Sequence, residues 1–231
     1  MQKFDLIVPS GSFCVTSYHL RQARRQGEAL PFDWLENVTP ELFAGFMESG
    51  FQDFLELKQL IPDGERKEGE PHCRFKMPNG IVFVHDFVDC NPQTDFASVR
   101  KKYDRRIERL NVKIAKARTI LFVHCSRAEA DEHMLRQIYR RLAALYPKKS
   151  IKFLYVHLVN GKHGFDYVSK TEGFDIVDME FGTNSDPKQF WIGNVPVFNQ
   201  MLSSYRLTFR ARFGFWCSRW KRKFSKNYDK M

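Results

Sequence analysis

The sequence predicts an α/β protein with a largely parallel central sheet and helices on both faces. Two stretches, TILFVH at 119–124 and SIKFLYVHLV at 150–159, are nearly continuous apolar runs, which are typical of strands covered on both sides. Between them, residues 129–145 have the spacing of an amphipathic helix, with Leu135, Ile138, Leu142 and Leu145 on one face. A strand, a helix and a second strand in this order favour a right-handed parallel crossover.

Turn residues and caps place the remaining elements. FDLIVP at 4–9 predicts a short buried strand, and a helix over 13–26 follows it, with Ser12 as N-cap and Gly27 at its end. Their apolar character suggests that the strands at 4–9, 81–87, 119–124 and 151–158 share the central sheet. The other expected elements are a helix capped by Thr39 with Pro40 at its first position, a helical stretch at 51–60, a loop or hairpin over 62–80, a helix over 99–117 and a strand near 174–178.

Length and composition fit one large domain, assigned to residues 1–204, followed by a short appendage. The apolar run at the N-terminus is too short for an export signal, and no run approaches the roughly 20 residues that would span a bilayer. A cytoplasmic protein is therefore expected. The cysteines are odd in number and form no CxxC pair, so all are expected as free thiols: Cys14, Cys73, Cys90, Cys125 and Cys217.

The segment 205–231 differs from the rest of the chain because it is basic and rich in aromatic residues. It holds nine Lys or Arg and one acidic residue, so most of the net charge of +10 lies there. Apolar residues recur every three or four positions from Leu202 to Tyr228, which predicts an amphipathic helix. Such a helix is suited to an anionic membrane surface, with contacts from Arg212, Trp216, Arg219, Trp220, Arg222 and Lys223.

Two alternatives remain for this basic segment. It could be an ordinary terminal helix that packs its aromatic side chains on the body of the protein. It could also bind nucleic acid, because bases stack on interleaved aromatic and basic residues. The nearly neutral body disfavours nucleic acid as a partner. The chain has neither a Walker loop nor a GxGxxG motif, so no nucleotide or other cofactor is predicted.

The best candidate for chemistry is Cys14, which lies where a strand and a Gly/Ser turn lead into a helix. Free backbone N–H groups and the helix dipole favour the reactive thiolate at such a position. His85 ends an apolar strand and could act as the general base, while Asp33 or Asp86 could orient its imidazole. Asp86 is the poorer candidate because adjacent strand residues point to opposite faces. The alternatives are a small buried cysteine and a half-exposed strand histidine.

A second histidine, His124, ends the strand at 119–124 and is followed by Cys125. In a parallel sheet both would open onto the carboxyl edge, where α/β proteins bind ligands, so His124 is a candidate for substrate binding. A zinc site built from cysteines 73, 90 and 125 and histidines 85 and 124 matches no closed-site spacing, and no metal is predicted.

Several motifs, in the same order, resemble a bacterial and viral family of papain-like cysteine peptidases. They are PSGSFCVTSYHLR, LPFDWLENV, VFVHDF, KKYDRRIERL and ILFVH, which together span residues 5–125. The resemblance implies Cys14 as nucleophile and His85 as its base. It adds as candidate site residues Asp33, Asp86, Tyr103, Arg105 and Arg106. A papain-like protein would have an α+β fold, whereas the apolar pattern of 119–159 favours a parallel sheet.

The function expected from these observations is that of a membrane-peripheral, cysteine-dependent enzyme. It would be a hydrolase or an acyl or glycosyl transferase that acts on a peptide, glycan or other envelope-associated substrate. The alternative is a non-catalytic binding or scaffold protein of envelope polysaccharide assembly, in which Cys14 is structural. A pKa of the Cys14 thiol below its reference value of about 8.5 is expected for the enzyme.

Overall fold

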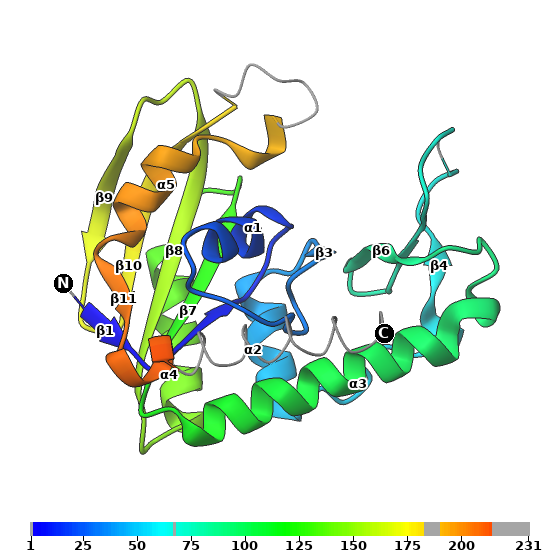
Figure 1. The fold of residues 1–231 in the computed structure, drawn as a ribbon, viewed down its shortest axis with the longest axis horizontal. Helices are drawn as coiled ribbons and strands as arrows, with labels where there is room; N and C mark the ends of the chain where they lie inside the picture. The colour runs from blue at the N-terminus through cyan, green and yellow to red at the C-terminus, as the bar shows by residue number, and fades with distance from the viewer. Residues whose placement is uncertain (1, 67, 183–189, 214–231) are drawn as a thin grey trace, which may run out of the picture.

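The fold is a mixture of helices and strands around a mostly parallel central sheet (Figure 1). The computed structural model describes residues 2–66, 68–182 and 190–213. The central sheet has the order β2-β7-β8-β10-β9. Its first four strands are parallel, and β9 pairs antiparallel with β10 at one edge. The strands are β2 (Leu6–Pro9), β7 (Thr119–Ser126), β8 (Ser150–Asn160), β9 (Phe165–Lys170) and β10 (Phe174–Phe181).

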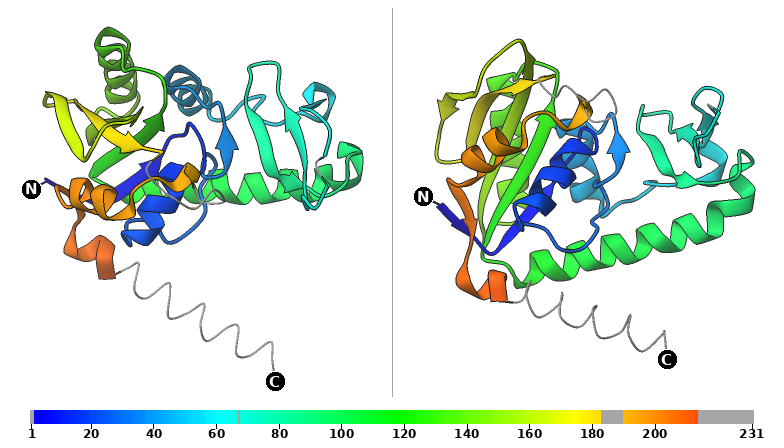
Figure 2. Two further views of the ribbon diagram at one scale, coloured as in Figure 1. Left: turned by 90° about the horizontal axis from the view of Figure 1, so that it is seen from above. Right: turned by 45° about the horizontal axis from the view of Figure 1, so that its top comes forward.

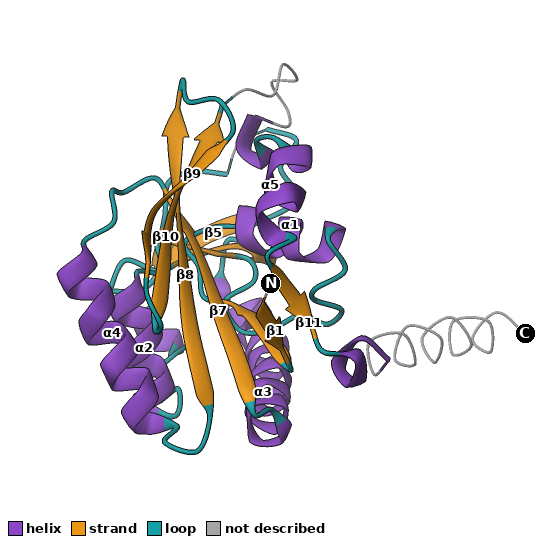
Figure 3. Cartoon of the chain, turned by 90° about the vertical axis from the view of Figure 1, so that its left-hand side faces the viewer, coloured by secondary structure: helices purple, strands orange, loops and turns teal. Residues whose placement is uncertain are grey.

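Helices cover both faces of this sheet (Figure 3). The two faces alternate along β7: Ile120 and Phe122 belong to one hydrophobic cluster, and Leu121 and Val123 belong to the other. The first cluster includes side chains of α2 (Pro40–Ser49), α3 (Pro92–Lys116) and α4 (Glu132–Leu145). The second includes side chains of α1 (Val15–Gln22) and α5 (Val195–Leu202). The prediction of a mostly parallel sheet with strands at 119–124 and 150–159 is confirmed.

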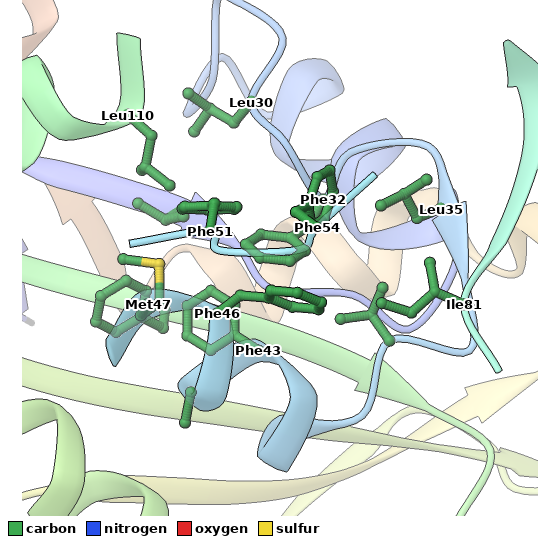
Figure 4. Packing of buried hydrophobic residues seen from close by; sticks show 14 of the residues in the cluster. Leu30, Phe32, Leu35, Phe43, Phe46, Met47, Phe51, Phe54, Ile81 and Leu110 are labelled. Atoms are coloured by element: carbon green, nitrogen blue, oxygen red, sulfur yellow. The ribbon is translucent and has the colours of Figure 1, made fainter. Parts of the chain in front are cut away.

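Phenylalanine rings fill the first cluster (Figure 4). Phe32 contacts Phe43, Phe51 and Phe54 with ring centroids 5.1 to 6.0 Å apart, mostly in tilted or edge-on pairs. The segment 51–60 does not form the expected α-helix and has only the short 3-10 helix η1 (Leu57–Gln59). Phe51 and Asp53 have positive φ angles of 66° and 55°, which no α-helix accommodates. These turns bury Phe51 and Phe54.

The strand at 81–87 belongs to a second, antiparallel sheet and not to the central one, so that prediction was wrong. This sheet has the order β3-β6-β5-β4. Its strands are β3 (Leu35–Glu36), β4 (Ile61–Pro62), β5 (Cys73–Lys76) and β6 (Val82–Phe87). A tight turn closed by Met77 N–H to the Ile81 carbonyl, 2.9 Å, pairs β5 with β6, which confirms the expected hairpin. An apolar run shows that a strand is covered but not which sheet it joins.

The long helix α3 runs beside both sheets (Figures 1 and 2). It begins at Pro92, earlier than the predicted residue 99, because the Asn91 side chain caps it by accepting the Gln93 N–H. The helix capped by Thr39 is confirmed, with Pro40 at its start. The helix expected over 13–26 is shorter and begins after Cys14, which is its N-cap residue in place of Ser12.

Residues 205–207 form a strand and not the start of a helix, so the expected helical start was wrong. Strand β11 (Tyr205–Leu207) pairs in parallel with β1 (Gln2–Phe4). The Tyr205 hydroxyl donates to Asp175 at 2.5 Å, and Asp175 pairs with Lys152 at 2.9 Å, all three side chains being buried. Residues 214–231, with Trp216, Arg219, Trp220, Arg222 and Lys223, lie outside the described residues, and Arg212 is exposed. Within the described ranges, no helix is long and apolar enough to cross a membrane.

Two of the cysteines expected as free thiols are joined. Cys73 and Cys90 form a disulfide between β5 and the segment after β6, with their Cα atoms 5.3 Å apart. The cause is the hairpin, whose register places Cys73 opposite Phe87, three residues before Cys90. Cys14 and Cys125 are free.

Candidate active site

Cys14 lies at the point where β2 leads into α1, and hydrogen bonds to β7 hold the connecting turn. Ser10 N–H donates to the Val123 carbonyl at 2.9 Å, and Ser12 N–H donates to the Cys125 carbonyl at 3.0 Å. Gly11 has a φ of 116°, and a Cβ there would lie 2.7 Å from the Cβ of Val38, so only glycine fits. The turn therefore fixes Cys14 at the carboxyl end of β2.

His85 approaches Cys14 from the other sheet. It lies on β6 and is exposed, while the next two residues, Asp86 and Phe87, are buried. The Nε2 atom of His85 is 3.7 Å from the Sγ atom of Cys14, which is hydrogen-bond distance for sulfur. The two residues predicted as nucleophile and base are thus brought together, 71 positions apart in the chain.

The pair lines an open cleft of about 1050 Å³ between the two sheets. Four large aromatic side chains line it, Phe13, Trp34, Phe190 and Trp191, and its charged residues are Glu36, Glu70, Arg106 and Arg127. The Arg127 guanidinium stacks 5.4 Å from the Phe13 ring centroid and 5.0 Å from that of Phe181. A cleft of this size and lining can hold an extended organic substrate with Cys14 at its wall.

The protonation states differ from the sequence-based expectation. Burial, and then the negative charge of Glu36, raise the pKa of the Cys14 thiol to about 11. Burial and the nearby His72 lower the pKa of His85. The expected depression of the thiol pKa was therefore wrong, because burial and the carboxylates outweigh the helix terminus. The resting pair at neutral pH is a thiol and a neutral imidazole, which suits His85 to accept the thiol proton during attack.

Glu36 should control the reactivity of this thiol. Replacing it with glutamine removes a negative charge from the cleft but keeps a hydrogen-bonding side chain for Arg74, which now contacts Glu36 at 2.7 Å. We expect Glu36→Gln to lower the pKa of Cys14 and to accelerate its alkylation by iodoacetamide about threefold at pH 8. Peptide mass mapping would measure the rate, and Glu108→Gln, at an exposed position on α3, is the control. An equal rate in both variants would contradict the role of Glu36.

Neither aspartate considered as the orienting acid contacts His85. Asp33 is fully buried, pairs with Arg21 at 2.7 Å and accepts from Gln26 at 2.7 Å, so it ties its loop to the end of α1. Asp86 is next to His85 in the chain but contacts helix α3 instead of His85, at a point where the pairing of β6 with β5 shifts register. It pairs with Lys102 at 2.5 Å and accepts from the Tyr103 hydroxyl at 2.8 Å. The ring nearest to His85 is that of His72, at 5.9 Å between centroids.

Of the four residues expected to bind substrate, only Arg106 lines the cleft. Its guanidinium stacks 5.0 Å from the Tyr103 ring centroid, and its Nη1 atom is buried without a hydrogen-bond partner among the described residues. Tyr103 is fully buried, and Arg105 is exposed on α3 away from the cleft. His124 is buried against Tyr155, with ring centroids 5.3 Å apart, because it lies inside β7 and not at its open end.

Sequence reasoning missed Glu36, His72 and Arg127. Glu36 follows the PFDW motif closely, but its strand β3 has only two residues and shows no periodicity. His72 lies in the polar stretch 62–80, where composition indicates only a loop. Across the parts of the chain that the structure describes, no group of three or more candidate ligands could hold a metal ion. Cys73 and Cys90 of the conceivable zinc set are paired with each other.

A thiol and an imidazole at hydrogen-bond distance in the lining of an open cleft are the pairing that enzymes with a nucleophilic cysteine use. Comparison with protein families agrees: the model of the family described as "Putative papain-like cysteine peptidase (DUF1796)" matches residues 5–164. The chain belongs to this family, and the match extends past residue 125, where the recognised motifs end. No curated protein and no solved structure gives a significant match.

Proposed function

We propose that the protein is a cysteine-dependent hydrolase in which Cys14 attacks an acyl carbon and His85 is its base. The observation that carries this proposal is the 3.7 Å approach of His85 Nε2 to Cys14 Sγ at the wall of the cleft. Membership of the peptidase family supports the same chemistry. An amide or ester of a peptide-like substrate is the matching substrate class.

The proposed reaction has two balanced steps. In the first, the thiol proton moves to His85 Nε2 as sulfur bonds to the acyl carbon, and the leaving amine or alcohol then takes that proton. In the second, His85 takes a proton from water, the resulting hydroxide attacks the thioester, and the proton returns to sulfur as the acid leaves. Backbone N–H groups in the first turn of α1 lack partners within the helix and are suited to stabilise the oxyanion.

Acylation can be tested without knowledge of the natural substrate. Incubation with p-nitrophenyl acetate should add one acetyl group to the intact protein, and peptide mapping should place it on Cys14. The buried Cys125, whose pKa burial raises to about 12, should remain unmodified and is an internal control. Acetylation spread over lysines, with Cys14 unmodified, would contradict the proposal.

Arg106 is proposed to favour substrates that carry a negative charge near the scissile bond. Iodoacetate and iodoacetamide have the same electrophilic carbon but differ by one negative charge, so their rate ratio at Cys14 reports the field in the cleft. We expect Arg106→Gln to lower the ratio of iodoacetate to iodoacetamide labelling about threefold, a moderate effect for a partly screened charge. Arg105→Gln, one residue away on the same helix but outside the cleft, is the matched control. Equal ratios in the two variants would remove Arg106 from the proposed site.

A membrane-peripheral location is the proposal that the basic segment supports. Residues 214–231 contain six Lys or Arg, one Asp and five aromatic side chains. Because Tyr205 and Leu207 are buried, the truncation that tests the segment is removal of 214–231, not of 205–231. We expect the truncated protein to lose sedimentation with anionic vesicles at low salt and to keep its thermal unfolding transition. If the truncated protein sediments as well as the full chain, the proposal is wrong. The suggestion that the enzyme acts on envelope-associated or glycan substrates would then lose its support.

A further inference from the structure

A second cavity, of about 500 Å³, lies at the opposite end of the central sheet from Cys14. It is bordered by Asp5, Leu6 and Ile7 where β2 begins, and by Ala117 and Arg118 just before β7. Cys14, by contrast, follows the carboxyl end of β2. The cavity is therefore separate from the proposed catalytic cleft, and none of its lining residues lines that cleft.

Positive charge dominates this cavity. Four of its lining residues are cations that form no ion pair with a carboxylate in the described parts of the chain: Arg25, Lys116, Arg118 and Arg210. They come from three separate regions, namely the segment after α1, the end of α3 with the residues that follow it, and the segment after β11. Cations from distant parts of the sequence thus converge on one cavity.

Five cations and two carboxylates line the cavity, so the carboxylates offset only part of its positive charge, although the charges of Asp5 and Arg118 attract each other. Asp5 accepts from the Arg118 N–H at 2.9 Å and from the Thr208 hydroxyl at 2.9 Å, so backbone and hydroxyl donors engage its oxygens. Glu28 pairs with Lys113 at 2.9 Å, and Arg109 lies 3.7 Å from it. The fifth cation of the lining, Lys113, is therefore the paired one.

Arg25 shows that the charge is incompletely compensated. Its Nε atom is buried and has no hydrogen-bond partner within the described ranges. A buried donor without a partner costs free energy, and a guanidinium can make paired bonds to an oxyanion. Burial, and then the nearby charges of Arg206 and Arg212, lower the pKa of Arg25, which is the sign of crowded positive charge. A bound anion would relieve both penalties.

We propose that this cavity binds a phosphate group, carried either by a small soluble molecule or by a lipid headgroup. Its several cations and guanidinium forks match a polyvalent oxyanion better than a single carboxylate. Its volume suits a phosphate with a small organic substituent. This site does not depend on the catalytic role of Cys14.

Calorimetric titration of the full chain with inorganic pyrophosphate, and sedimentation with vesicles containing phosphatidic acid, distinguish the two sources. Arg25→Gln and Arg118→Gln should each weaken binding about tenfold. Lys101→Gln removes the same charge from an exposed position on α3 outside the cavity and should bind like the parent protein. A thermal unfolding transition shows whether each variant is folded. If Arg25→Gln does not fold, the binding measured with Arg118→Gln is the test of the site.

Each outcome bears on the proposal. Pyrophosphate binding that Arg118→Gln weakens and Lys101→Gln does not supports a soluble phosphate ligand. The same pattern with vesicles alone supports a lipid headgroup, because the segment 214–231 is identical in both variants. No binding of either probe by the parent protein, or equal binding by the Arg118 and Lys101 variants, overturns the site.

Discussion

Replacing His85 with alanine should slow the acylation of Cys14 by p-nitrophenyl acetate by about 100-fold or more, the usual contribution of a positioned general base. Cys14→Ala should abolish the initial burst of nitrophenolate completely. The reason is the resting state of the pair: with the thiol pKa raised to about 11, almost no thiolate exists at neutral pH without a base. A stopped-flow trace of nitrophenolate release measures both variants.

The pH dependence of the same burst separates this mechanism from a thiolate–imidazolium pair. Because the pKa of His85 is lowered from 6.5, the rate should be maintained down to that pH and fall only below it. It should rise again toward the thiol pKa of about 11 as free thiolate forms. His133→Ala, an exposed histidine on α4, is the control and should behave like the parent protein. A burst that survives His85→Ala at full rate would remove His85 from the mechanism.

The four parallel strands of the central sheet were predictable because their sequences are mainly apolar, as expected of strands buried on both faces, whereas β9, with alternating burial at the edge, was not predicted. Apolar runs at 119–124 and 150–159 favour covered strands, and the helix between them favours a parallel crossover. The segment 81–87 is equally apolar, but its strand is buried in a different sheet. Its strand β6 packs Phe83 and Phe87 into the aromatic cluster and pairs locally with β5. Hydrophobicity alone does not distinguish these two environments.

Cys14 and His85 were each proposed from local features, a strand-to-helix turn and a histidine expected to end a strand, although His85 lies inside β6 and not at its end. The surroundings of the pair are not local. Burial and the charge of Glu36 raise the thiol pKa, and both depend on how the paired strands β3 and β6 come to lie beside Cys14. Asp33 was a candidate to orient the His85 imidazole, yet in the folded chain it contacts Arg21 and Gln26. The charges around Cys14 and Asp33 depend on tertiary packing, so they could not be predicted from the local sequence.

Acidification from pH 6.5 to pH 5 should destabilise the protein strongly through two buried histidines. His124 packs on Tyr155 inside the sheet, and burial lowers its pKa to about 3. The ring of His19 stacks 3.6 Å from that of Phe198, and burial lowers its pKa to about 4. Each folded pKa lies below the unfolded value of 6.5, so the unfolded chain binds more protons between these values. These histidines cost no stability above pH 6.5, and the loss grows as the pH falls from 6.5 towards the folded pKa values.

The size of the effect follows from the width of this window. One pKa unit corresponds to about 1.4 kcal/mol, so each histidine should remove about 2 kcal/mol of unfolding free energy between pH 6.5 and pH 5. Urea denaturation at pH 7, 6 and 5 measures the free energy of unfolding. His124→Gln, which cannot take up a proton, should roughly halve the pH slope even if it lowers stability at pH 7, and His133→Gln, at an exposed position on α4, is the control. Equal slopes for the His124 variant and the parent protein would mean that His124 is not held neutral by its burial.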